Sequence, residues 1–320
     1  MKNTFKYLAF FSVLFLFSCE KEIEIELPET PPKLVVEGKI ETGQFPIILL
    51  SKSTGYFDPT DAVSIANSYV KDATITISNG TTTETMLKIC SSTLTPAQKE
   101  ALSNQLGIPR QLLDANDICG FTSLTMPGEA GKSYTITIDW EGEQYVSTTE
   151  VPNSIPLDST WFKIQGDRDS LGFLWAELDE PATLGDRYRW FAKRINSYKH
   201  GVLTGQQKDN GFLAPFGSVF EDKFINGIKF EFGYQRASET QKEDDLAPER
   251  NFFKVGDTVV IKFCTIDEGV FQFVDKSDRQ VQSNGSPFAA PSNVPSNISN
   301  GGLGIWAGYG TYFDTVVCSK

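Results

Sequence analysis

Short stretches in which apolar and polar residues alternate recur along most of this 320-residue chain. In the stretch 134–138, one tyrosine and two isoleucines fall on one face and two threonines on the other. This is the period-two pattern of a half-buried strand. Glu141, Gly142 and Glu143 then precede a second alternating stretch, so an antiparallel hairpin is expected. No regular strand–helix–strand succession is visible, which disfavours a parallel doubly wound sheet. The chain is predicted to be all-β and mainly antiparallel.

The predicted strands form two groups on either side of residues 151–156, which contain Pro152 and Pro156. The first group covers residues 34–40, 46–51, 73–78, 85–89, 134–140 and 144–151. The second group covers residues 161–164, 173–178, 188–195, 228–234, 258–265 and 304–317. We therefore expect two β-sandwich-like domains, an N-terminal Ig-like domain over residues 33–152 and a C-terminal β-rich domain over residues 153–320.

Two helices are expected within this β-rich pattern. Thr95 can cap a helix that begins at Pro96, and good helix formers follow up to a glycine, so a helical insertion is predicted near 95–107. Because it lies between Cys90 and Cys119, a disulfide would staple it. Such an insertion can shape a binding edge or be decoration, and the sequence leaves both open. The second helix is predicted near 268–282, with an apolar face made of Val270, Phe271, Phe273 and Val274.

The N-terminus is typical of an exported protein. Two lysines precede an apolar run of about 11 residues, which is too short to span a bilayer, so residues 1–18 are interpreted as a removable signal peptide. Ser18 and Cys19 resemble the bacterial lipobox, in which the cysteine is acylated and becomes the first residue; Phe17 is bulkier than is usual there. Residues 19–32 are acidic and rich in proline, which predicts a solvated tether. An acidic cluster behind a lipidated cysteine also resembles the surface-export signal of Bacteroidota lipoproteins, so an outer-membrane location facing the cell exterior is expected.

Charge and cysteine content add two expectations. The formal charge of −12 becomes −14 when two lysines leave with the signal, and such an acidic chain repels phosphate backbones, so nucleic acid is not an expected partner. Besides Cys19, the chain has Cys90, Cys119, Cys264 and Cys318. Four cysteines allow three pairings. Their order along the chain favours Cys90 with Cys119 and Cys264 with Cys318, while four buried free thiols are the alternative.

Catalytic chemistry has little support in the sequence. His200 is the one histidine and lies in a polar stretch, so a histidine-rich metal site is impossible, and neither HExxH nor GxSxG is present. Paired carboxylates could serve a glycoside hydrolase, and the adjacent acids at 179–180 and 267–268 are nominal candidates. Adjacent acids in turns are usually solvated strand ends. No catalytic residue, cofactor site or metal site is predicted.

Three further features admit both a structural and a functional interpretation: a glycine-rich stretch, an oxygen-rich stretch and a set of aromatic residues. Residues 301–310 are rich in glycine but lack the helix that a phosphate-binding loop requires. They are predicted to form a strand in which neighbouring backbone approaches closely. The stretch 57–61 offers oxygen ligands without calcium-site spacing and is taken as a loop. Five aromatic residues could form a sugar platform or fill the core: Tyr56, Phe57, Trp161, Trp190 and Phe191.

Several segments, in this order, resemble a family of Bacteroidota outer-membrane lipoproteins known as domain of unknown function 4249. They are the Ser18–Cys19 start with its acidic tail, and residues 34–40, 48–57, 70–77, 127–136 and 301–309. The resemblance implies no catalytic residue. It implies a surface lipoprotein encoded beside TonB-dependent receptors, with a role in nutrient capture or receptor assembly.

Taken together, these features predict a non-enzymatic accessory lipoprotein of a TonB-dependent receptor, without cofactor and with an unidentified ligand. The alternatives are a surface glycan hydrolase that uses paired carboxylates and an adhesin or structural surface module.

Overall fold

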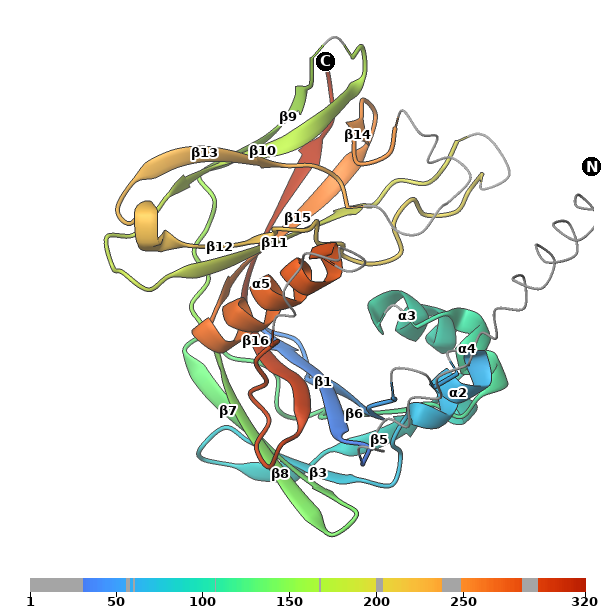
Figure 1. The fold of residues 1–320 in the computed structure, drawn as a ribbon. Coiled ribbons are helices and arrows are strands. Elements are labelled where there is room, and N and C mark those ends of the chain that lie inside the picture. The colour runs from blue at the N-terminus through green and yellow to red at the C-terminus, as the bar shows by residue number, and fades with distance from the viewer. Residues whose placement is uncertain are drawn as a thin grey trace, which may run out of the picture. The chain divides into compact units, whose positions relative to one another are not determined.

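The computed structural model describes residues 31–55, 58–59, 61–106, 108–166, 168–199, 204–237, 249–283 and 293–320. Residues Pro32–Lys320 form one compact unit, in which an eight-stranded sheet is the largest element (Figure 1). In spatial order its strands are β12 (Val219–Glu221), β11 (Arg187–Arg194), β15 (Thr258–Ile266), β16 (Leu303–Val317), β1 (Leu34–Glu41), β2 (Ile47–Lys52), β6 (Cys119–Thr122) and β5 (Leu87–Cys90). β1 and β16 are parallel, and the other neighbours in this sheet are antiparallel.

Two smaller sheets complete the β structure. The first contains β4 (Thr83–Thr85), β3 (Thr74–Ser78), β7 (Lys132–Trp140) and β8 (Glu143–Val151). The second contains β13 (Lys229–Tyr234), β10 (Leu171–Asp179), β14 (Phe253–Lys254) and β9 (Ser159–Ile164). The turn between β7 and β8 has positive φ at Glu141 and Gly142, as a two-residue hairpin turn requires. The predicted all-β, mainly antiparallel fold and this hairpin are confirmed.

Each small sheet packs on the large sheet through its own apolar core. The first core joins β1, β2, β6 and β16 to β3, β7 and β8, and Trp306 is completely buried within it. Its indole Nε1 donates a hydrogen bond to the Tyr134 carbonyl oxygen at 2.9 Å. The second core joins β11, β15 and β16 to β10 and β13, and it contains buried Trp190 and Phe263. Both tryptophan environments follow from strand alternation, which directs every second side chain to the same face.

β16 connects the two cores because it contributes Trp306 to one and Val316 to the other. The backbone that links β8 to β9 crosses β16 between them. A Cβ on Gly308 would lie 1.8 Å from the Glu150 carbonyl oxygen, and one on Gly310 would lie 2.1 Å from the Pro152 carbonyl oxygen. These glycines are therefore required by close backbone contact, as predicted for the glycine-rich stretch.

Helices lie on the opposite face of the large sheet (Figure 1). α5 (Glu268–Ser283) packs on β11, β12 and β16, and Val270, Phe271 and Val274 form its buried face. α3 (Pro96–Leu106) and α4 (Arg110–Ala115) pack near β2 through a separate apolar cluster that includes Leu49 and Leu113. The two predicted helices are thus present. No helix within the described ranges is long and apolar enough to cross a membrane.

The sequence analysis did not anticipate several short elements. They are the helices α2 (Ala62–Ser68) and α4, the strands β4, β6, β12 and β14, and two 3-10 turns, Ser91–Thr93 and Asp222–Phe224. Asp61 caps α2 by accepting hydrogen bonds from two backbone amides. The division at residue 152 stays a prediction. The large sheet takes strands from both sides of that position.

Candidate functional site

A cleft of about 800 Å³ lies on the helix-bearing face of the large sheet. Strand alternation explains its lining: Tyr188 and Trp190 of β11 face the core, so Arg189, Phe191 and Lys193 face the cleft. The full lining comprises Lys39, Glu41, Gln44, Phe45, Ile47, Ala101, Asn104, Leu106, Arg189, Phe191, Lys193, Gln207, Asn210, Gly211, Phe212, Leu213, Lys262, Tyr309 and Phe313. Volumes of about 300–1,000 Å³ are typical of small-molecule sites.

The segment around Gly211 approaches α3 above the sheet. A Cβ on Gly211 would lie 2.6 Å from the Asn104 carbonyl oxygen, so backbone meets backbone there and the cleft is bounded by both segments. Lys193 Nζ donates a hydrogen bond to the Asn210 carbonyl oxygen at 3.0 Å and links β11 to the same segment. The cleft is therefore formed jointly by the sheet, the helical insertion and this loop.

A buried ion pair forms part of the cleft. Lys262 Nζ lies 3.1 Å from both carboxylate oxygens of Glu41, and the two side chains are 6% and 11% exposed. Lys39 contacts the same carboxylate at 3.2 Å. Burial alone would raise the pKa of Glu41, but the charges of Lys262 and Lys39 outweigh this effect and hold the pKa below its ordinary value. Glu41 is therefore ionised at neutral pH.

Aromatic rings surround these charges. Lys262 Nζ lies 4.4 Å from the ring centroid of Phe191 and 5.1 Å from that of Phe212. The Arg189 guanidinium lies 4.7 Å from the Phe191 centroid, and Phe191 contacts Tyr309 edge-on. These are cation–π distances. Phe45 and Phe313 also line the cleft and are 44% and 49% exposed, so apolar ring surface is available to a bound molecule.

Arg189 is the least satisfied cation of the cleft. Its Nη1 donates to the Tyr309 hydroxyl at 2.9 Å, whereas its Nε is buried and has no hydrogen-bond partner in the structure. Over the described ranges, neither Arg189 nor Lys193 forms an ion pair with a carboxylate. With four cationic side chains against the single carboxylate of Glu41, the lining carries a formal charge of 4 − 1, or +3. This charge stands out in a chain whose net charge is −12.

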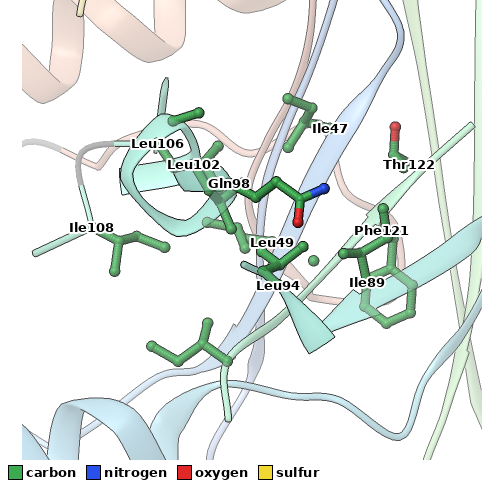
Figure 2. A pocket seen from close by; sticks show the side chains of 13 residues that line it. Ile47, Leu49, Ile89, Leu94, Gln98, Leu102, Leu106, Ile108, Phe121 and Thr122 are labelled. Atoms are coloured by element: carbon green, nitrogen blue, oxygen red, sulfur yellow. The ribbon is translucent and has the colours of Figure 1, made fainter. Parts of the chain in front are cut away.

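A second, apolar hollow of about 260 Å³ lies between α3 and strands β2, β5 and β6 (Figure 2). Its walls are mostly aliphatic: Ile47, Leu49, Ile89, Leu94, Ala101, Leu102, Leu106, Ile108 and Ile118, with Gln98, Gly120, Phe121 and Thr122 completing them. Three residues, Ile47, Ala101 and Leu106, line both this hollow and the cleft. The two spaces are therefore neighbours along α3.

The expected disulfide of the insertion is confirmed, because Cys90 and Cys119 are bonded and lie opposite each other on β5 and β6. The expected bridge between Cys264 and Cys318 is wrong, and both are free and buried. Cys264 lies opposite Thr311, seven residues from Cys318 along β16, which corresponds to roughly 23 Å. The two thiols also lie in different apolar clusters. Burial raises the pKa of each thiol to about 12.

Two residues that the sequence analysis singled out, Cys19 and His200, lie outside the described residues. So do Tyr56 and Phe57 of the candidate aromatic platform. Trp190 is a core residue, whereas Phe191 lines the cleft. Trp161 pairs with Trp175 across β9 and β10 and is outside the lining.

Of the four nominated carboxylates, Asp179 is exposed at the end of β10, and the other three have structural partners. Glu180 accepts hydrogen bonds from the Tyr188 hydroxyl and the Gly227 amide. Asp267 accepts one from the Val270 amide at the start of α5, and Glu268 forms an ion pair with Arg187. None of these acids lines the cleft.

One acidic group in the described part of the chain has the geometry to hold a cation: Glu180, Asp186 and Asp222 lie close together. Asp222 accepts hydrogen bonds from the Gly185 and Asp186 amides, which anchors that turn. Burial and the charges of Glu180 and Asp222 raise the pKa of Asp186. The hydrogen bonds give Glu180 and Asp222 a structural role in holding neighbouring turns.

The cationic cleft was missed by the sequence analysis. The alternation of Arg189, Phe191 and Lys193 was a visible signal for one polar face of β11, but nothing local relates it to Lys39 or Lys262. Lys262 is 221 residues from its partner Glu41, and only the neighbouring positions of β15, β16 and β1 bring them together.

The fold and the cleft together define an all-β protein with a ligand-sized cleft on one sheet. The chain belongs to the family described as Domain of unknown function (DUF4249), whose model matches residues 20–312. No curated protein matches the chain. The cycloalternan-degrading enzyme from Trueperella pyogenes in complex with cycloalternan is a similar solved structure, at 11% identity and a TM-score of 0.24. The match covers 72% of this chain and 29% of that one.

Proposed function

We propose that this protein is a non-enzymatic capture protein that binds an anionic ligand in the cleft. Its membrane attachment is through a lipid on Cys19 at the outer membrane, facing the exterior, and it acts as an accessory subunit of a TonB-dependent receptor. The observation that carries the binding role is the +3 lining of the cleft within a chain of −12. The signal-like residues 1–18 and the Ser18–Cys19 pair support the location, and the family resemblance supports the partner.

The cleft binds anions because of its own positive charge, although the chain as a whole is acidic. Charges are screened over about 8 Å at physiological ionic strength, so a ligand inside the cleft responds mainly to Arg189, Lys193 and the Lys262–Glu41–Lys39 group. Charge-assisted hydrogen bonds to Arg and Lys are the usual means of binding carboxylate and phosphate groups. The buried, unpartnered Nε of Arg189 would gain an acceptor from such a group.

Binding is tested with anilinonaphthalene sulfonate, a fluorescent anion with apolar rings. The double variant Arg189→Ala/Lys193→Ala should weaken its affinity at least tenfold, since each charge-assisted contact contributes about 1.5–3 kcal/mol. The matched control, Lys132→Ala/Arg250→Ala, removes two exposed positive charges outside the lining and should change the affinity less than twofold. Equal losses in both variants would reject the cleft as the binding site.

The partner is tested separately by gentle detergent extraction of the tagged protein from its native membranes, followed by mass spectrometry. A TonB-dependent receptor should co-purify in stoichiometric amount, with both the wild type and the cleft variant. Recovery of the protein with no receptor would reject the accessory role and leave the binding role in place.

A further inference from the structure

We propose that the ligand is an anionic amphiphile whose charged head lies in the cleft and whose apolar chain occupies the hollow under α3. This inference rests on the proposed function, because it uses the cleft as the head-group site. It adds a second site, the hollow, and with it the chemical class of the ligand.

The hollow itself indicates an apolar occupant. Concave, mostly apolar hollows are the usual form of small-molecule sites. A space of about 260 Å³ exceeds the roughly 150 Å³ cavity that holds a benzene molecule. Its aliphatic walls on β2, β5 and α3 (Figure 2) cannot hydrogen-bond to a polar guest, so a polar group there would lose its hydration without compensation.

The side-chain oxygens of Gln98 and Thr122, the two polar side chains of the hollow, have hydrogen-bond partners within the protein. Gln98 Oε1 accepts hydrogen bonds from the backbone amide and hydroxyl of Thr95, which forms a capping box at the start of α3. Thr122 Oγ1 donates to the Pro46 carbonyl oxygen at 2.7 Å. The amide nitrogen of Gln98 is the side-chain donor that remains beside otherwise apolar walls, which matches a guest that is mostly hydrocarbon.

The hollow and the cleft are continuous, so one molecule can occupy both if it has an apolar chain and an anionic head. Ile47, Ala101 and Leu106 line the hollow and the cleft alike, and the cleft adds the cations of Lys39, Arg189, Lys193 and Lys262. A guest that extends from one space into the other must combine a negative charge with an apolar chain. Linear carboxylates with alkyl chains are the simplest molecules of this class.

The test is displacement of bound anilinonaphthalene sulfonate by hexanoate, octanoate, decanoate and dodecanoate, each below its micelle concentration. Affinity should rise about fourfold for every methylene that enters the hollow, since burial of one methylene contributes about 0.8 kcal/mol. Dodecanol, which lacks the charge, should compete at least tenfold more weakly than dodecanoate. Equal affinity for the acid and the alcohol would overturn the head-group assignment.

Two substitutions at Gln98 form a matched pair, one that fills the hollow and one that leaves it open. Gln98→Trp places a large ring in the hollow, and Gln98→Ala loses the same cap while leaving the hollow open. The tryptophan variant should bind hexanoate within twofold of wild type and show no gain with longer chains, whereas the alanine variant should keep the gain. Circular dichroism verifies that both are folded.

Each outcome has one meaning. If hexanoate displaces the probe and longer chains bind no better, the amphiphile inference fails and the proposed function stands. If no carboxylate displaces the probe, the cleft is not an anion site and the proposed function fails as well. If chain length matters equally in wild type and Gln98→Trp, the chain lies elsewhere and the inference is overturned.

Discussion

Glu41→Gln would leave the ammonium of Lys262 buried without its carboxylate. The pair is 6% and 11% exposed, with both oxygens 3.1 Å from Nζ. Removal of one partner from a buried pair costs about 3–5 kcal/mol, because the remaining charge is desolvated without compensation. The rings of Phe191 and Phe212 still stabilise the cation, so we expect the lower end, about 3 kcal/mol.

The same pair predicts a dependence of stability on pH. The pKa of Glu41 is lower in the folded protein than its ordinary value of 4.5, so the folded state favours the ionised form. The stabilisation is present above the ordinary pKa and is lost as the pH falls through the folded pKa. Wild type should therefore lose stability on acidification below about pH 4.5, and Glu41→Gln should lose less over that range.

The assay is urea unfolding followed by tryptophan fluorescence, at pH 7 and at acidic pH. In a thermal melt, a loss of about 3 kcal/mol corresponds to a decrease in Tm of roughly 5 °C for a chain of this size. The double variant Glu41→Gln/Lys262→Met, which removes both charges, should recover most of the loss. The control is Glu141→Gln, which breaks the exposed pair with Lys52 and should cost less than about 1 kcal/mol. A Glu41→Gln cost below 1 kcal/mol, or a double variant as unstable as the single one, would refute the reasoning.

Three further predictions concern stability. Replacement of Cys90 and Cys119 by serine should lower the free energy of unfolding by about 3–4 kcal/mol, because the bridge closes a loop with a sequence separation of 29; thermal unfolding that is unchanged by reductant would contradict this. Gly308→Ala should cost more than about 1–3 kcal/mol through its backbone clash, whereas Gly120→Ala, whose Cβ would lie 3.4 Å from its nearest neighbour, should be near neutral in the same urea titration. Asp267→Ala removes the acceptor at the start of α5 and should cost about 0.5–2 kcal/mol, measurable as a lower Tm and faster amide exchange in the first turn of that helix.

Much of the secondary structure follows from the sequence because its causes are local. Alternation predicts β7 and β8, and the Glu141–Gly142 turn predicts their pairing, since both residues adopt the positive φ that the turn needs. Pro96 and the capping residue Thr95 likewise predict α3. The short helices α2 and α4 carry too few residues to show a period, which explains why the sequence analysis missed them.

The pairing of cysteines shows where local reasoning ends. Cys90 and Cys119 lie on adjacent strands at facing positions, so their order along the chain gives the right partner. The same argument fails for Cys264 and Cys318, because the antiparallel register of β15 and β16 places Cys264 opposite Thr311, seven positions from Cys318. Strand register, which no local pattern of these residues reveals, decides between a disulfide and two free thiols.

The amino-acid sequence by itself determined the longer strands, the two longer helices, the glycine-dependent strand β16 and the family. These depend on side-chain periodicity, backbone conformation and turn residues, which act over a few positions. The tertiary structure alone decided the order of the eight-stranded sheet and hence the cleft. Lys39 and Glu41 on β1, Arg189 on β11 and Lys262 on β15 meet because distant strands are neighbours, and the burial that pairs their charges exists only once that sheet has formed.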